Sequence, residues 1–169
     1  MKKQLLHSGW QLTTVGKNDT IPATVPGSVY NDLLNAGRME DPYWRDNEMK
    51  ALALMDEDYR YNTTFDVNAD VLNSERVLLR CEGLDTIADI VLNGEKIASV
   101  CNMHRTWEFD VKDSLKTTGN TLEIVFHSPT KYIKEQDKIC HAGGSGDAMV
   151  GFPNLRKAHC MFGWDWGPR

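Results

Sequence analysis

The sequence predicts an all-β fold, a jelly-roll β-sandwich with one or two short helices. Apolar and polar residues alternate along 59–67, which is typical of a strand with one buried face. Asn93-Gly94 joins two further alternating runs and suits a type I′ turn, because both turn positions need positive φ angles. Such strands recur about every ten residues, a spacing typical of sandwiches and jelly rolls.

The totals indicate one acidic domain. The chain has 169 residues, of which 41% are hydrophobic and 25% charged, with a net charge of −5. This charge argues against nucleic acid and membrane partners, because both attract basic patches. No run approaches the roughly 20 apolar residues of a membrane span, and the charged start at 1–7 lacks the apolar stretch of a signal peptide. Cytoplasmic, periplasmic and lysosomal locations all stay open.

The first 58 residues are predicted to contain a strand, a helix and a loop. Apolar and polar residues alternate at 6–15, which indicates a first strand. Ser28 is a suitable N-cap for a short helix at 29–35, and Gly37 a suitable stop. Residues 41–44 begin a loop that continues past Asn47-Glu48.

The next part of the chain is predicted to consist mainly of strands joined by turns. After Pro129 the pattern changes: residues 131–138 are charged and predict one or two helical turns, and the Gly-rich stretch 142–147 predicts a loop. The remaining predicted strands are 75–82, 87–92, 95–100, 105–111 and 121–127.

The segment 162–169 carries the strongest functional pattern. Trp164 and Trp166 flank Asp165 in a frame of glycine and proline, which excludes a helix interior. A tryptophan face suits the apolar face of a sugar ring, and a carboxylate accepts hydrogen bonds from sugar hydroxyls. The alternative is structural, with both indoles in a core or interface and Asp165 capping a turn.

Other catalytic arrangements lack their required parts. No serine lies in a G-x-S-x-G elbow, and no H-E-x-x-H pair is present. Glu48 lies in the early loop without a second glutamate on a strand end, whereas retaining glycosidases hold two carboxyl groups about 5–5.5 Å apart. We therefore expect no catalytic residue in this chain.

The cysteines are predicted to be free and mostly buried thiols, because none forms a C-x-x-C pair. Adjacent cysteine and histidine residues occur at 140–141 and 159–160, but adjacent residues rarely reach the same tetrahedral zinc. We expect no metal and no cofactor. The four cysteines are Cys81, Cys101, Cys140 and Cys160.

Several segments together match the motifs of one family of enzymes. The matching segments are Gly9-Trp10 with Leu12, Val25-Pro26-Gly27-Ser28-Val29 with Asp32-Leu33-Leu34, Asp41-Pro42-Tyr43-Trp44-Arg45-Asp46-Asn47-Glu48, Leu84-Asp85-Thr86-Ile87-Ala88, Val91-Leu92-Asn93-Gly94, Leu155-Arg156-Lys157-Ala158 and Phe162-Gly163-Trp164-Asp165-Trp166-Gly167-Pro168. Together they resemble the N-terminal domain of β-mannosidases of glycoside hydrolase family two, which is galactose-binding-domain-like. The final segment resembles the F-x-W-D-W-G-P motif of that branch, and the hairpin segments resemble those shared with β-galactosidases and β-glucuronidases.

The resemblance implies that 1–169 is one domain of a larger enzyme, with a core at about 4–130 and a loop-rich stretch at 131–169. Downstream immunoglobulin-like domains and a (β/α)₈ barrel, which holds both catalytic glutamates, would be its partners. The parent enzyme would remove terminal β-D-mannose from oligosaccharides or glycans with retention, and this chain alone would be inactive.

The same resemblance implies roles for the final motif in a mannose subsite. Trp164 would form a wall of the subsite, Asp165 would accept sugar hydroxyls, and Trp166 would pack. Two rival functions remain: an accessory domain of another family-two enzyme, such as a β-galactosidase or exo-β-glucosaminidase, or a stand-alone carbohydrate-binding module.

Overall fold

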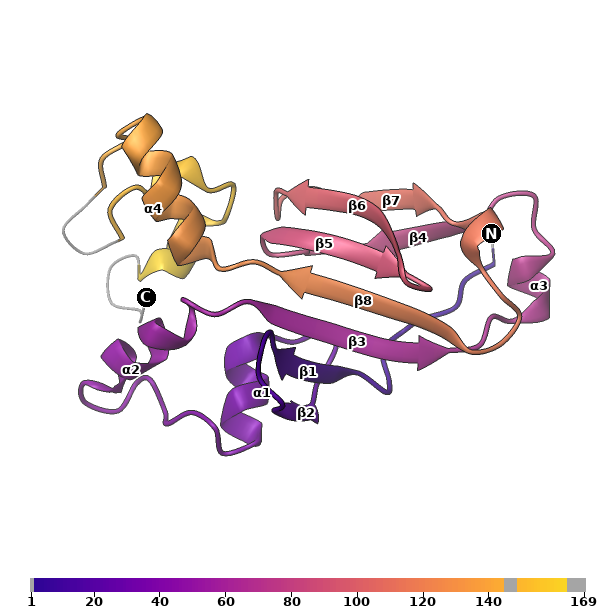
Figure 1. The fold of residues 1–169 in the computed structure, drawn as a ribbon, viewed down its shortest axis with the longest axis horizontal. Helices are drawn as coiled ribbons and strands as arrows, with labels where there is room; N and C mark the ends of the chain where they lie inside the picture. Colours follow the sequence, from indigo (N-terminus) through magenta and orange to yellow (C-terminus); the bar gives the residue numbers. More distant parts are fainter. Residues whose placement is uncertain (1, 145–148, 164–169) are drawn as a thin grey trace.

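The computed structural model describes residues 2–144 and 149–163 and contains two antiparallel sheets (Figure 1). The larger sheet has the strand order β2-β1-β3-β8-β5-β6, and the smaller sheet pairs β4 with β7. Most regular structure is strand, which confirms the predicted fold class. The strands are β1 (Gln11–Thr14), β2 (Thr20–Pro22), β3 (Tyr59–Phe65), β4 (Leu78–Cys81), β5 (Ile87–Leu92), β6 (Glu95–Cys101), β7 (Trp107–Asp110) and β8 (Asn120–Phe126).

The core is built from the alternating residues of the central strands. Ile124 of β8 lies opposite Tyr61 of β3 on one side and Ile90 of β5 on the other. Leu92 lies opposite Leu122 in the same register. Successive residues of a strand face opposite sides of the sheet, so these five paired or alternate residues share one face. All five side chains are buried. The period-two pattern thus fixes which face of the large sheet is internal.

The predicted hairpin and helix caps are confirmed. Asn93 and Gly94 have φ angles of 53° and 85°, as a type I′ turn requires. Ser28 accepts a hydrogen bond from the backbone N–H of Asn31 at 3.3 Å and so caps the first helix. The α-helices are α1 (Val29–Asn35), α2 (Asn47–Leu54), α3 (Ala69–Leu72) and α4 (Pro129–Ile139), and the 3₁₀ turns are η1 (Lys112–Ser114), η2 (Phe152–Asn154) and η3 (His159–Phe162).

The structure differs from the prediction near the N-terminus. The strand predicted at 6–15 is only Gln11–Thr14, so residues 6–10 precede it and Val15 follows it. Gly9 adopts a φ of 72°, and the Trp10 indole N–H donates to the Leu6 carbonyl at 2.9 Å, which holds the preceding segment in a turn. Helices α2 and α3 were not predicted. Within the described ranges, none of the helices has the length and apolar character that crossing a bilayer requires.

One end of the sandwich collects two helices and the later part of the chain. Helices α2 and α4 and the segment 149–163 lie together there, whereas α3 lies at the opposite end (Figure 1). The Ser128 hydroxyl at the start of α4 donates to the Met55 carbonyl at the end of α2, with an oxygen–oxygen distance of 2.5 Å. This end therefore joins segments that are more than seventy residues apart in the sequence.

Candidate functional site

A groove of about 450 Å³ opens beside the central strands of the large sheet. Its walls come from the loop that precedes α1, the loop that precedes β5, the start of α4 and the segment that follows η2. The volume lies within the range of small-molecule sites. Aromatic and methionine side chains contribute to the lining, among them Tyr59, Tyr61, Phe126, Met55, Met103 and Met161.

The groove wall beside α1 is fixed by a buried carboxylate. Asp32 is only 2% exposed, and it accepts hydrogen bonds from the Tyr61 hydroxyl at 2.8 Å and from the Thr24 backbone N–H at 2.9 Å. Burial, followed by the hydrogen bond to Asp32, raises the pKa of Tyr61 well above its usual range. Tyr61 therefore remains a donor, and Asp32 is a structural residue that holds the loop before α1.

A second wall is formed by residues that lead towards the end of the chain. Arg156 pairs in parallel with Asn102, and its carbonyl accepts from the Met103 backbone N–H at 3.1 Å. Lys157 forms an ion pair with Asp85, and the exposed fractions of their side chains are 17% and 20%. These contacts attach residues 156–157 to two separate loops of the sandwich.

A small second core supports this segment from the other side. Ile133 of α4 packs with Leu155 and Phe162, and all three are buried. Gly151 adopts a φ of 80°, and a Cβ atom there would lie 3.0 Å from Ile133 Cγ2. Only glycine suits both the backbone conformation and this close approach. The turn at Gly151 thus brings the chain back against α4.

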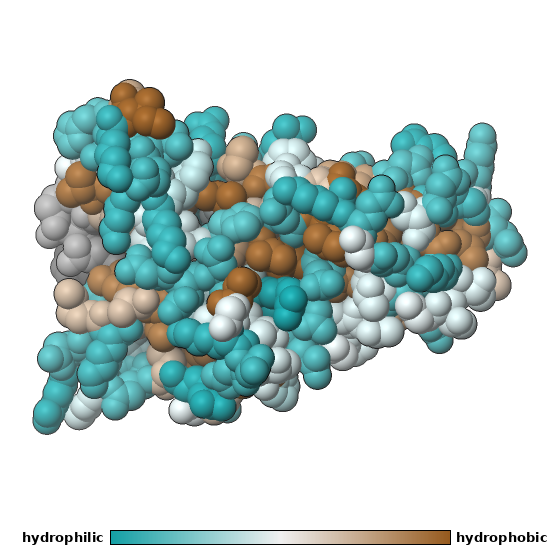
Figure 2. Space-filling view, in the orientation of Figure 1, coloured by the Kyte–Doolittle hydropathy of each residue, from teal (hydrophilic) through white to brown (hydrophobic). Residues whose placement is uncertain are grey.

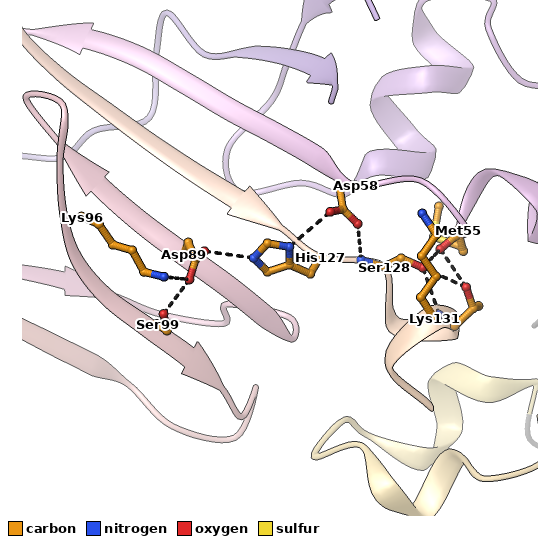
Figure 3. Close-up of polar contacts among 9 residues, drawn as sticks. Met55, Asp58, Asp89, Lys96, Ser99, His127, Ser128 and Lys131 are labelled. Atoms are coloured by element: carbon orange, nitrogen blue, oxygen red, sulfur yellow. Dashed lines mark hydrogen bonds and ion pairs between the residues drawn. The ribbon is translucent and has the colours of Figure 1, made fainter. Parts of the chain in front are cut away.

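A network of charged and polar groups ties α4 to the large sheet (Figure 3). His127, directly after β8, lies between two carboxylates: Nδ1 is 3.2 Å from Asp58 Oδ2, and Nε2 is 3.1 Å from Asp89 Oδ2. Asp58 also accepts from the Ser128 backbone N–H at 2.8 Å, and Lys96 lies 2.8 Å from Asp89. The network connects β5, β6 and the start of β3 with the first turn of α4.

The network shifts the pKa values of His127 and Asp89. Burial alone would lower the pKa of His127, but hydrogen bonds to Asp89 and Asp58 outweigh it and raise the pKa above the usual value. Hydrogen bonds from Lys96 and Ser99 lower the pKa of Asp89 to about 2. Below this raised pKa the ring is an imidazolium between two carboxylates, and it joins the elements that carry them.

The predicted sugar-binding residues Trp164, Asp165 and Trp166 lie outside the described residues, as does Arg169. Their assigned roles stay predictions. The described chain ends at Gly163, which follows η3 with a φ of 75°. Met161, two residues earlier, lines the groove. The groove itself was missed by sequence reasoning, although its walls include the segments around Pro26 and Asp85 that carry the family resemblance.

Two local predictions were wrong. Glu48 lies in helix α2 and not in a loop, because residues 47–54 consist mostly of strong helix formers. The cysteines are mostly exposed: only Cys81 is buried, whereas Cys101, Cys140 and Cys160 face solvent. Among residues 2–144 and 149–163, no cluster of three or more histidine, cysteine or acidic side chains is arranged to hold a metal ion.

Hydrophobic side chains also reach the surface at the end that carries α4 (Figure 2). Ile139, the last residue of that helix, is 80% exposed, and Val150 and Met161 are exposed in the segment that follows. Trp44 lies in the loop before α2 and is also exposed, with the Arg45 guanidinium 5.5 Å from its ring centre. Apolar side chains of α4, of the segment that follows it and of the loop before α2 are thus exposed to solvent.

Comparison with known proteins identifies the domain type. A family model described as the glycosyl hydrolase 2 galactose-binding domain-like family matches residues 10–169. The chain is 32% identical over 173 residues to the β-mannosidase of Bos taurus, and the match covers 96% of this chain and 19% of that protein. It is 36% identical over 169 residues to β-mannosidase A of Emericella nidulans, with 94% and 17% covered.

Solved structures give the same result. The β-D-mannosidase of Dictyoglomus thermophilum superposes with a TM-score of 0.90 at 38% identity, covering 97% of this chain and 20% of that one. The exo-chitosanase of Amycolatopsis orientalis shares the fold at a TM-score of 0.61 and 22% identity, with 70% and 16% covered. The chain spans about a fifth of the length of the curated relatives it matches. It belongs to the galactose-binding-like N-terminal domains of glycoside hydrolase family 2.

Proposed function

We propose that this chain is the N-terminal accessory domain of a retaining exo-β-mannosidase that removes terminal β-D-mannose from oligosaccharides or glycans. Relatives named β-mannosidase match the chain over nearly its whole length, which supports this assignment. The chain covers about a fifth of each of them, so most of such an enzyme lies in other domains.

The proposed domain comprises residues 1–169, with a sandwich core at about 4–130 and the loop-rich stretch at 131–169. Its partners are immunoglobulin-like domains and a (β/α)₈ barrel of the same polypeptide. The barrel supplies both catalytic glutamates, since retention of configuration needs two carboxyl groups about 5–5.5 Å apart. The chain alone is therefore inactive.

The contribution of this domain is a sugar subsite formed by residues 164–166 of the loop-rich stretch. Trp164 forms a wall against the apolar face of mannose, Asp165 accepts hydrogen bonds from its hydroxyls, and Trp166 packs against protein. The observation that best supports this role is the double attachment of Arg156 and Lys157 to the sandwich. A segment held this firmly suits the orientation of a ligand a few residues further along.

The test is the substitution Asp165→Ala in the full-length enzyme. Loss of a desolvated acceptor should raise KM and lower kcat/KM for an aryl β-mannoside about 30-fold, which corresponds to about 2 kcal/mol. Asp70→Ala is the matched control, because Asp70 belongs to α3 at the opposite end of the sandwich. Unchanged kinetics for Asp165→Ala would refute the subsite.

Substrate specificity separates the rival family-two activities. The full-length enzyme should hydrolyse the aryl β-mannoside with a higher kcat/KM than the matching β-galactoside or β-glucosaminide. The purified 169-residue chain should hydrolyse none of the three. Turnover by the chain alone would contradict its accessory role, and a preference for either other glycoside would reassign the parent enzyme.

A further inference from the structure

We infer that Lys157 is a positioning residue for the sugar subsite and that it acts through its ion pair with Asp85. This inference rests on the proposed function of the Trp164-Asp165-Trp166 segment and deepens it. Lys157 precedes Trp164 by seven positions and lies 72 positions after Asp85. The ion pair is thus a long-range tether that lies close in sequence to the predicted sugar-binding residues.

The environment of the pair makes it a strong tether. The two side chains are largely buried, with exposed fractions of 17% and 20%, whereas the other lysine ion pairs of the described residues involve lysines at least half exposed. The second carboxylate oxygen of Asp85 accepts from the Thr86 hydroxyl, which orients the carboxylate. A shielded charge pair with a fixed acceptor is attracted more strongly than an exposed pair.

Three neighbouring contacts fix the orientation of residues 156–158 beside the ion pair. Asn102 pairs in parallel with Arg156, and the Met103 backbone N–H donates to the Arg156 carbonyl at 3.1 Å. The backbone N–H of Ala158 lies 2.9 Å from Met103 Sδ. Residues 156–158 are therefore held against the loop after β6 while Lys157 reaches the loop before β5. Two attachment points on different loops fix the orientation of a segment, which one point does not.

The pair also lines the groove. Lys157, Asp85 and Met161 all contribute to its wall, so loss of the pair would loosen the wall at the point from which the chain continues towards Trp164. Misplacement of a positioning segment by about 1 Å can lower activity about 100-fold. We therefore expect Lys157→Met to lower kcat/KM for the aryl β-mannoside between about 10-fold and 100-fold.

A double-mutant cycle in the full-length enzyme tests the coupling. If Lys157 acts through the sugar-binding segment, Lys157→Met should cost little more once Asp165→Ala is already present. Additive losses would overturn the inference. The outcome of Asp165→Ala alone decides the proposed function separately: an effect of Asp165→Ala without an effect of Lys157→Met overturns only the role of Lys157.

Hydrogen exchange of the full-length enzyme supplies a readout that does not depend on activity. Lys157→Met should speed amide exchange in peptides that cover 155–163 by tenfold or more and leave peptides of β3 and β8 unchanged. Equal exchange in all peptides, or faster exchange throughout the sandwich, would contradict a positioning role. Lys17→Met is the control, because Lys17 forms an exposed long-range pair with Glu57.

Two further variants guard against misfolding. Lys157→Met leaves the Asp85 carboxylate buried without its partner, which can destabilise the whole domain. Asp85→Asn combined with Lys157→Met removes both charges and should fold, yet it should show the same faster exchange at 155–163. Lys157→Arg keeps the charge and should restore most of the kcat/KM. Failure of either result would show that the tether does not position this segment.

Discussion

His127 Nδ1 lies 3.2 Å from Asp58 Oδ2, although the two residues are 69 positions apart. Asp89 lies 3.1 Å from the other ring nitrogen, so both nitrogens of the imidazole face carboxylates. This arrangement favours the doubly protonated ring and joins the start of α4 to three strands of the large sheet. The domain should therefore depend on pH in a predictable direction.

The first prediction concerns this pH dependence. The folded-state pKa of His127 is raised, so its stabilisation is complete below the unfolded pKa of about 6.5 and is lost as the pH rises through the higher folded pKa. The free energy of unfolding should exceed that of His127→Gln by at most about 1 kcal/mol at pH 5.5, because the ring is partly exposed. The difference should shrink by pH 9.

Urea unfolding at several pH values measures this difference. His104→Gln is the control, because His104 is exposed in the turn after β6 and its side chain has no place in the network. A difference for His127→Gln that is independent of pH, or that grows with pH, would show that the imidazolium does not stabilise the fold.

The second prediction concerns the buried Asp32. Tyr61→Phe removes the hydroxyl that donates to this carboxylate at 2.8 Å and leaves one of its oxygens without that partner. The free energy of unfolding should fall by about 1–3 kcal/mol. Tyr43→Phe serves as the control, because Tyr43 is 77% exposed. Equal midpoints of urea unfolding for the two variants would show that the hydrogen bond between Tyr61 and Asp32 does not stabilise the fold.

The third prediction isolates the close approach at Gly151. Gly151→Ala strains a left-handed backbone and also places a Cβ atom 3.0 Å from Ile133 Cγ2, whereas Gly119→Ala strains a similar backbone with open space around it. Gly119→Ala should therefore cost about 1 kcal/mol and Gly151→Ala more. Thermal unfolding compares the two variants. A smaller loss for Gly151→Ala would mean that the turn does not pack tightly against α4.

The fourth prediction concerns the thiols. Burial raises the pKa of Cys81 to about 11, so at pH 8 very little of it is the reactive thiolate. In the native chain the three exposed cysteines should react with Ellman's reagent first, as measured by the absorbance of the released thiolate. Cys81 should react only after denaturant is added. Cys81→Ala should leave the fast phase unchanged. A fast phase of four thiols would contradict the burial of Cys81.

Sequence reasoning found the parts of the fold that local chemistry decides. The turn at Asn93-Gly94 and the cap at Ser28 both depend on residues next to one another, and both were confirmed. Helix α3 has only four residues and β2 only three, too few for a periodic pattern. The composition of helix α2 favours a helix, but the loop signal at 41–44 lies directly before it and obscures its start.

The candidate site was less accessible from sequence because it is assembled from distant segments. The residue types around Asp165 predict a sugar subsite, and this stays a prediction because residues 164–166 lie outside the described structure. The rest of the site depends on tertiary contacts. His127 contacts Asp58 across 69 positions, and Lys157 contacts Asp85 across 72 positions. The groove is likewise lined by segments that are distant in the sequence. No local periodicity reports such contacts.

A crystal structure of the full-length enzyme with a bound mannose-configured inhibitor would show where Asp165 lies relative to the sugar. We expect a carboxylate oxygen of Asp165 about 2.6–3.0 Å from a sugar hydroxyl, with the Trp164 ring against the sugar. An Asp165 side chain turned away from the bound sugar, with both indoles buried among protein atoms, would contradict it.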